Sequence, residues 1–144
     1  MKYSPLQTPL RIVIVEDNDD SRMMMSELLE LSGFECHTAS TGRMGVDVIN
    51  ELRPDVALID IGLPELDGLE VARLLRQDPR NDKLLMIALT GYGQREDREA
   101  ARRAGFDTHL VKPVDFEVLH GLLRAQADKR TRIEPSLEDT LPAE

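Results

Sequence analysis

Short apolar runs alternate along the chain with longer segments in which apolar residues recur every three or four positions. The runs have the length and the β-branched composition of buried strands. They read RIVIV (11–15), FECHT (34–38), DVALID (55–60), LLMIAL (84–89) and THLV (108–111). Because strands that are apolar along most of their length belong to sheets covered on both faces, the pattern predicts a buried parallel sheet.

The segments between the runs carry apolar stripes at helical spacing. The stripes are Met24, Leu28 and Leu31; Gly45, Val48, Ile49 and Leu52; Gly68, Val71, Ala72 and Leu75; Ala100, Ala101 and Ala104; and Phe116, Leu119 and Leu123. Strand and helix therefore alternate five times, which predicts a doubly wound α/β domain with right-handed crossovers.

The chain has the length of one domain, and we expect that domain to span residues 10–127. Residues 1–9 form an N-terminal extension. From residue 128 onward the helical periodicity is lost, and TRIEPSLEDTLPAE contains two prolines and several acids. We therefore expect an acidic, disordered tail over residues 128–144.

Charge and composition exclude several classes of function. A net charge of −9 disfavours direct binding to nucleic acid, which requires clustered Lys and Arg, and disfavours an anionic membrane surface. No stretch approaches the roughly 20 apolar residues of a membrane span. A single cysteine excludes an internal disulfide and suits a reducing compartment, so we expect a cytoplasmic protein without membrane insertion.

Polar residues stand where the predicted strands end. Glu16 and Asp17 follow the first strand, Asp60 ends the third, Thr90 follows the fourth, and Lys112 follows the fifth. The carboxyl ends of parallel strands form the usual site of an open α/β sheet. Carboxylates about 4 Å apart repel each other by about 1 kcal/mol in water and about 4 kcal/mol at intermediate dielectric, a cost that a divalent cation removes.

The residue types at these strand ends indicate phosphate chemistry. Hard oxygen ligands suit Mg²⁺, and a lysine with a hydroxyl on the same rim suits a phosphoryl group. Taken alone, an acid at a strand end such as Asp60 is more often a turn or cap residue. The combination of three acids, a hydroxyl and a lysine favours a functional site.

Two other motifs start at Asp17. A calcium-binding loop would need Gly at Arg22 and Glu at Leu28, so that interpretation fails. A haloacid dehalogenase-like phosphatase would use Asp17 as nucleophile and Asp19 as acid. The phosphatase hypothesis gives Asp60 no role, yet it stays open as an alternative. Asp19 and Asp20 otherwise suit the N-terminal cap and first turn of a helix.

Over residues 10–127 the sequence resembles the receiver domains of bacterial two-component response regulators. The resemblance rests on IVEDN after the first strand, LIDIGLPELDG around Asp60, ALTGY at Thr90 and GFDTHLVKPV at Lys112. The amino-acid sequences of the later motifs are most similar to those of receivers in hybrid sensor kinases and chemotaxis-type proteins. The resemblance implies a flavodoxin-like (βα)5 fold with strand order 2-1-3-4-5.

The resemblance also implies a phosphoacceptor switch. Asp60 would accept a phosphoryl group from the phosphohistidine of a sensor histidine kinase or histidine phosphotransfer protein. Glu16, Asp17 and the backbone carbonyl of Gly62 would hold Mg²⁺ or Mn²⁺ together with Asp60. The domain would catalyse its own phosphorylation and dephosphorylation, without being a conventional metabolic enzyme.

Further roles follow from the same resemblance. Lys112 would contact the phosphoryl oxygens and Thr90 would move to bond one of them, changing the face made by helix four, strand five and helix five. A downstream protein would bind this face. Its basic residues are Arg95, Arg98, Arg102 and Arg103. These arginines suit a solvated helix surface equally well.

Three positions make the details of the switch specific to this chain. His109 replaces the Tyr or Phe that the family usually has in strand five, and Gly62 and Tyr92 occupy positions that tune dephosphorylation. A receiver-like interaction module that no longer cycles phosphate is the remaining alternative.

Overall fold

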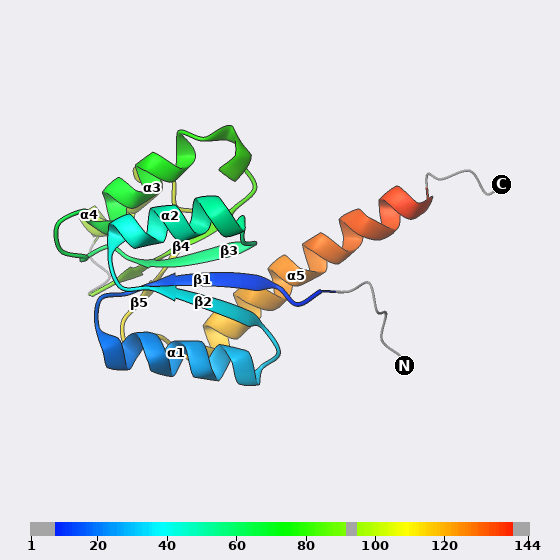
Figure 1. Cartoon of the computed structure of the whole chain (residues 1–144), viewed down its shortest axis with the longest axis horizontal. Helices are drawn as coiled ribbons and strands as arrows, with labels where there is room; N and C mark the ends of the chain where they lie inside the picture. Colours follow the sequence, from blue (N-terminus) through cyan, green and yellow to red (C-terminus); the bar gives the residue numbers. More distant parts are fainter. Residues whose placement is uncertain (1–7, 92–94, 140–144) are drawn as a thin grey trace. The chain divides into compact units, whose positions relative to one another are not determined.

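The computed structural model describes residues 8–91 and 95–139 and divides the chain into two compact units, Met1–Val114 and Asp115–Glu144. The first unit contains a five-stranded parallel sheet in the order β2-β1-β3-β4-β5 (Figure 1). Its strands are β1 Arg11–Val15, β2 Glu35–Ala39, β3 Val56–Asp60, β4 Leu85–Thr90 and β5 Thr108–Val111. The predicted fold class and strand order are confirmed.

Four helices connect these strands, and a fifth forms the second unit. They are α1 Asp19–Leu31, α2 Gly42–Leu52, α3 Gly68–Arg76, α4 Arg95–Ala104 and α5 Phe116–Asp139, with a 3-10 helix η1 at Pro79–Asn81. Helix α1 lies on one face of the sheet, and α2 and α3 lie on the opposite face (Figure 1). The predicted stripes of α2 and α3 face the core, which confirms the periodicity argument for these two helices.

The central strands are buried because both faces of the sheet are covered. Every residue of β3 is buried, as are four of the five in β1 and five of the six in β4. The registers pair Val15 with Ile59 and Thr90 with Val111, so neighbouring strands end at the same edge of the sheet. This edge carries the polar residues that follow the strands.

Helix α1 lies where the sequence predicts it but buries a different face. The predicted stripe of Met24, Leu28 and Leu31 is exposed, with 85% of Leu31 accessible. The core side instead carries Leu29, while Arg22 donates from its guanidinium to the backbone oxygen of Glu16 at 2.9 Å. The helix has two apolar stripes, so the expectation was wrong about which one packs inward.

Helix α5 extends further than the sequence predicts. It continues to Asp139, whereas we expected disorder from residue 128. The expectation relied on the loss of apolar periodicity, which shows only whether a helix has a face to pack against the rest of the protein. Residues 125–134 are rich in Ala, Lys, Arg and Glu, which have high helix propensity without such a face. Within the described ranges, no helix combines the length and apolar composition that a membrane crossing requires. Residues 1–7 and 140–144, from the two predicted end segments, lie outside the described residues.

A buried asparagine organises the edge of the sheet where the strands begin. Asn81 donates from Nδ2 to the Leu75 carbonyl at 2.9 Å and to the Asn50 side chain at 3.1 Å. Its Oδ1 accepts from the guanidinium of Arg53 at 2.9 Å. These bonds satisfy every polar atom of a side chain that is almost fully buried.

Replacing Asn81 with Leu is expected to lower the free energy of unfolding by about 1–3 kcal/mol, because the Leu75 carbonyl and the Arg53 guanidinium each lose one of their hydrogen bonds beside a buried side chain. Urea denaturation followed by circular dichroism measures the change. Lys83→Ala, two residues away and exposed, serves as the control and is expected to stay within about 0.5 kcal/mol of wild type. Equal stabilities for Asn81→Leu and Lys83→Ala would contradict the role of this network.

Candidate functional site

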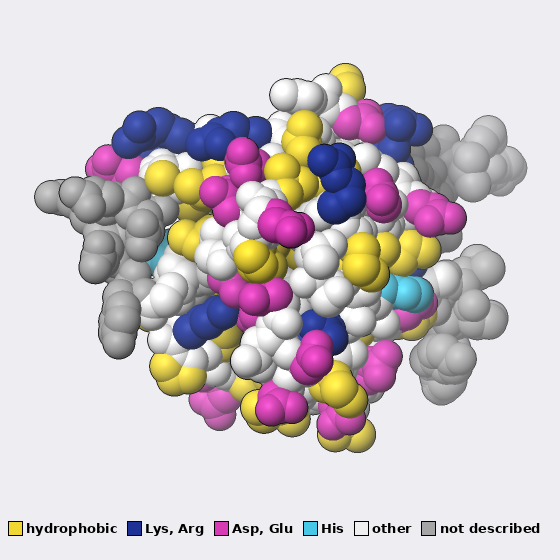
Figure 2. All heavy atoms as spheres, turned by 60° about the vertical axis from the view of Figure 1, so that its left-hand side comes forward, with side chains coloured by type: hydrophobic (Ala, Val, Ile, Leu, Met, Phe, Trp, Pro, Cys, Tyr) yellow, Lys and Arg dark blue, Asp and Glu magenta, His cyan; other side chains and the backbone are white. Residues whose placement is uncertain are grey.

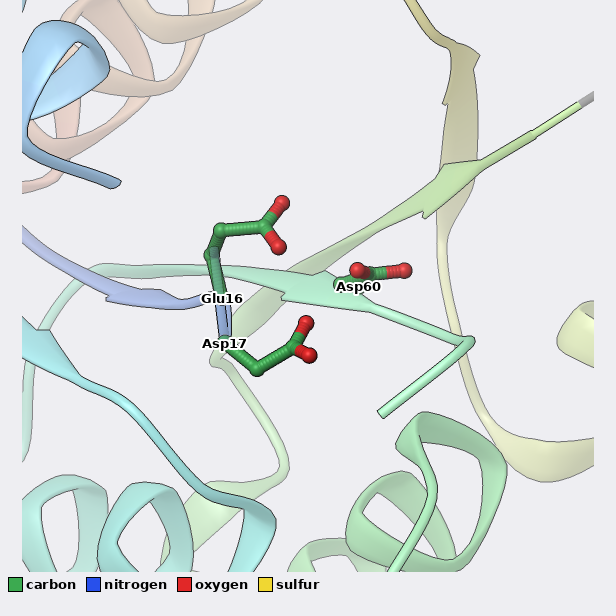
Figure 3. A group of neighbouring side chains, drawn as sticks. All are labelled: Glu16, Asp17 and Asp60. Carbon is green, nitrogen blue, oxygen red and sulfur yellow. The ribbon is translucent and has the colours of Figure 1, made fainter. Parts of the chain in front are cut away.

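Three carboxylates meet at the edge where the strands end. Glu16 and Asp17 directly follow β1, and Asp60 is the last residue of β3, the strand beside β1. One oxygen from each side chain lies within 4.8 Å of the others. The side chains of Glu16 and Asp17 both extend toward Asp60 (Figure 3). Figure 2 turns this edge toward the viewer and shows acidic side chains near the middle of the face. The predicted convergence of the three acids is present.

Asp60 is 8% exposed, and both of its oxygens have a donor. Oδ1 accepts from the backbone N–H of Gly62 at 2.9 Å, and Oδ2 accepts from Lys112 Nζ at 2.9 Å. These two bonds fix the orientation of the carboxylate at the carboxyl end of β3. The N–H of Gly62 thus contributes to the site, whereas the role of its carbonyl as a metal ligand stays a prediction from the family resemblance.

The turn after Asp60 is held by the start of α3. Asp67 caps this helix by accepting from the Glu70 N–H at 2.9 Å, and the Glu70 side chain accepts in return from the Asp67 N–H at 3.1 Å. Gly68 donates its N–H to the Ile61 carbonyl at 3.2 Å. At Gly68 the helix therefore lies directly against the backbone that carries Asp60.

Glu16 is the most buried acid of the group, with 1% of the residue exposed. Its Oε1 accepts from Lys112 Nζ at 2.9 Å and its Oε2 accepts from the N–H of Asn18 at 3.1 Å. Burial raises the pKa of the Glu16 carboxyl above its ordinary value, although both bonds oppose the rise. A buried carboxylate with a raised pKa is stabilised by additional positive charge nearby.

Lys112 bridges Glu16 and Asp60. Burial alone would lower the pKa of this ammonium, but its hydrogen bonds to Asp60 and Glu16, with the negative charges of both, outweigh burial and raise the pKa. The side chain therefore remains a cation at neutral pH. Its position between the two carboxylates offsets part of their mutual repulsion.

Thr90 is fully buried, and its hydroxyl is directed toward β5. Oγ1 donates to the Leu110 carbonyl at 3.5 Å, while the Thr90 carbonyl accepts from the N–H of Lys112 at 2.7 Å. The structure thus gives Thr90 a bond to β5 and leaves its expected contact with a phosphoryl group as a prediction.

His109 lies in β5 beside Ala88 of β4 and lines a surface groove between α4 and β5. It does not join the carboxylate group. Tyr92 and the side chain of Arg95 lie outside the described residues.

Sequence reasoning missed two residues that organise the site. Asn18 caps α1 by accepting from the Ser21 N–H, and its own N–H donates to Glu16. Asp19 and Asp20 lie in the first turn as expected, but neither is the cap. Arg22 bonds the Glu16 carbonyl from the next turn. Asn is a preferred N-cap residue, so the position of Asn18 between a predicted strand and a predicted helix could have identified its role.

Comparisons with known proteins agree with this fold. Residues 12–124 match the response regulator receiver domain family. The polar-differentiation response regulator DivK of Brucella anthropi is 36% identical over 106 residues, covering 74% of this chain and 86% of DivK. The regulatory protein AtoC of Escherichia coli is also 36% identical over 110 residues, but the match spans only 23% of AtoC and 76% of this chain.

A solved structure shows the same fold. The chemotaxis protein CheY4 of Vibrio cholerae superimposes with a TM-score of 0.78 at 26% identity, covering 82% of this chain and 98% of CheY4. The family match, the relatives and the fold together establish that this chain belongs to the response regulator receiver domain family.

Proposed function

We propose that the domain is a phosphoacceptor switch in which Asp60 is the nucleophile. The observation that carries the proposal is the setting of the Asp60 carboxylate. It is held between the Lys112 ammonium and the Gly62 N–H, with the carboxylates of Glu16 and Asp17 beside it. This arrangement supplies a fixed nucleophile, a cation for the transferred oxygens and two further acidic ligands.

Phosphoryl transfer depends on positioning and charge neutralisation more than on covalent help from the protein. One Asp60 oxygen forms a bond to phosphorus as the bond from phosphorus to the donor's imidazole nitrogen breaks, and that nitrogen keeps the electron pair. The Gly62 N–H holds the carboxylate in place during the approach. The Lys112 ammonium is within reach of the incoming phosphoryl oxygens because it already contacts Asp60.

The acidic group fits a hard divalent cation. Its donors are three carboxylates within 4.8 Å of one another, the oxygen ligands that Mg²⁺ and Mn²⁺ prefer. Glu16, Asp17 and Asp60 would hold the ion, with the Gly62 carbonyl as a further ligand. When bound, the ion neutralises charge on the phosphoryl oxygens. The raised pKa of Glu16 supports the fit, because a cation relieves the cost of its buried charge.

Metal removal gives a direct check of this function. Incubation with acetyl phosphate and Mg²⁺ is expected to add the mass of one phosphoryl group to the intact chain. Addition of EDTA is expected to suppress the product, because the carboxylates then repel the incoming phosphoryl group. Intact-mass spectrometry with and without EDTA measures both results. Equal labelling in EDTA would exclude a role for the metal, and no labelling in Mg²⁺ would favour the interaction module.

Phosphorylation would act on the surface through Thr90. The hydroxyl that bonds the Leu110 carbonyl would turn to a phosphoryl oxygen, which frees a backbone acceptor in β5 next to His109. The face that includes α4 and β5 would then change its arrangement. A sensor histidine kinase or histidine phosphotransfer protein would supply the phosphoryl group, and a downstream protein would read the changed face.

The phosphatase hypothesis fits the geometry less well. Its proposed acid, Asp19, accepts from Arg22 at 2.6 Å and belongs to the first turn of α1. The proposed nucleophile, Asp17, is exposed, whereas Asp60 beside it has a hydrogen-bond donor on each of its two oxygens.

A further inference from the structure

The loop between β1 and α1 carries two acids of the site, and the first of them is held from several sides. The Glu16 N–H donates to the Ala39 carbonyl of β2 at 3.1 Å. Its two carboxylate oxygens accept from Lys112 Nζ at 2.9 Å and from the Asn18 N–H at 3.1 Å. Both the backbone and the side chain of Glu16 therefore have fixed partners.

The second acid of the loop, Asp17, has no such support. Its side chain is exposed, and among the residues that the structure describes none donates a hydrogen bond to its carboxylate or forms an ion pair with it. The carboxylate nevertheless extends toward Asp60 (Figure 3). Because no side-chain contact sets this direction, it depends on the backbone that carries Asp17, and first on the peptide group that joins Glu16 to Asp17.

Arg22 of α1 holds this peptide group. Its Nη1 donates to the Glu16 carbonyl oxygen at 2.9 Å, and this carbonyl belongs to the peptide bond between Glu16 and Asp17. Its Nη2 donates to the Asp19 carboxylate at 2.6 Å. Only 15% of the Arg22 side chain is exposed. The planar guanidinium thus uses two nitrogens at once, and the carboxylate on one of them orients the bond made by the other.

We infer that Arg22 is a positioning residue for the metal ligand Asp17. Its bond to the Glu16 carbonyl fixes the peptide group from which the Asp17 carboxylate reaches the ion, without contact between Arg22 and the ion itself. The inference rests on the proposed function, which assigns Asp17 to Mg²⁺. Residues that orient a metal ligand in this indirect way contribute about 10- to 100-fold to metal affinity.

The charge of Arg22 alone would have the opposite effect. Its guanidinium is a cation beside a site for a cation, so removal of the charge would tighten Mg²⁺ binding if position did not matter. Arg22→Met distinguishes the two effects. Methionine keeps an unbranched apolar side chain in place of the largely buried arginine stem, but it has neither the charge nor a donor for the Glu16 carbonyl.

The test is an NMR titration of the ¹⁵N-labelled full chain with Mg²⁺, without a phosphoryl donor. Arg22→Met is expected to raise the Kd for Mg²⁺ by about 10-fold, the lower end of the range for indirect positioning, because Asp17 is one of several ligands. Arg22→Lys keeps the charge and a donor and is expected to lie between Arg22→Met and wild type. In the metal-free spectrum, the Asp17 amide is expected to shift in Arg22→Met, because it shares a peptide group with the Glu16 carbonyl.

The matched control is Arg73→Met, which removes the same charge from an exposed position on α3 and is expected to bind Mg²⁺ no more weakly than wild type. Urea denaturation checks that each variant is folded. Three results would overturn the inference: Arg22→Met binding Mg²⁺ as tightly as wild type or more tightly, an unchanged Asp17 amide, or equal weakening in Arg73→Met. Failure of the wild-type chain to bind Mg²⁺ would instead contradict the proposed metal site itself, and the inference with it.

Discussion

Replacement of Asp60 by Asn is expected to abolish phosphoryl transfer to the chain. Asn has nearly the same volume, and its amide oxygen can still accept from the Gly62 N–H. Its amide nitrogen is a poor nucleophile and places a donor opposite the Lys112 ammonium, where Asp60 places an acceptor. The variant should therefore fold while losing both the reacting oxygen and the bond to Lys112. Intact-mass spectrometry after incubation with acetyl phosphate and Mg²⁺ measures the loss.

The control for this variant is Asp47→Asn on α2, an exposed position where the same substitution removes the same charge. It is expected to be labelled like wild type. Circular dichroism of Asp60→Asn checks that its fold is retained. Full labelling of a folded Asp60→Asn variant would remove Asp60 from the mechanism and direct attention to Asp17.

Gly68→Ala is expected to have the largest effect on stability. A Cβ at this position would lie 2.5 Å from the Ile61 Cα and even closer to the Asp60 carbonyl oxygen. Both are backbone atoms of the strand end and turn that carry the nucleophile, so neither can move aside cheaply. Overpacking of this kind costs about 1–3 kcal/mol, and we expect the upper part of that range. Urea denaturation gives the value, and the labelling rate should fall with it.

A second glycine provides a control, because its replacement is expected to change the free energy of unfolding in the opposite direction. Gly121 lies within α5, and a Cβ there would have no neighbour within 4 Å. Alanine is a better helix former than glycine, so Gly121→Ala is expected to stabilise the chain by about 0.5–1 kcal/mol. If both substitutions changed stability in the same direction, the close approach at Gly68 would not be the cause.

The fold was predictable because the two sequence features that indicate it, the apolar runs and the polar residues that end them, are local. Apolar runs such as VALID mark the buried strands, and the acids at strand ends follow from where those runs stop. The order of strands then brings Glu16, Asp17 and Asp60 to one edge. Lys112 joins them because β5 ends at the same edge.

Features that depend on tertiary contacts were not predictable in the same way. Helix α1 carries two apolar stripes, and the sequence does not show which of them packs against the sheet. In the structure, the stripe with Leu29 packs inward, and Arg22 on the same side bonds the Glu16 carbonyl. The direction of the Thr90 hydroxyl depends on a carbonyl of another strand. The ion pair of Asp107 with Arg76 of α3 joins residues that are 31 positions apart, which no local pattern indicates.

The most direct test of the account locates the phosphoryl group. The chain is incubated with acetyl phosphate and Mg²⁺, and borohydride reduction then converts an aspartyl phosphate into homoserine. Proteolysis and tandem mass spectrometry identify the residue that has changed. The account predicts homoserine at position 60 and an unchanged residue at Asp17. Homoserine at position 17 instead, with Asp60 intact, would contradict it.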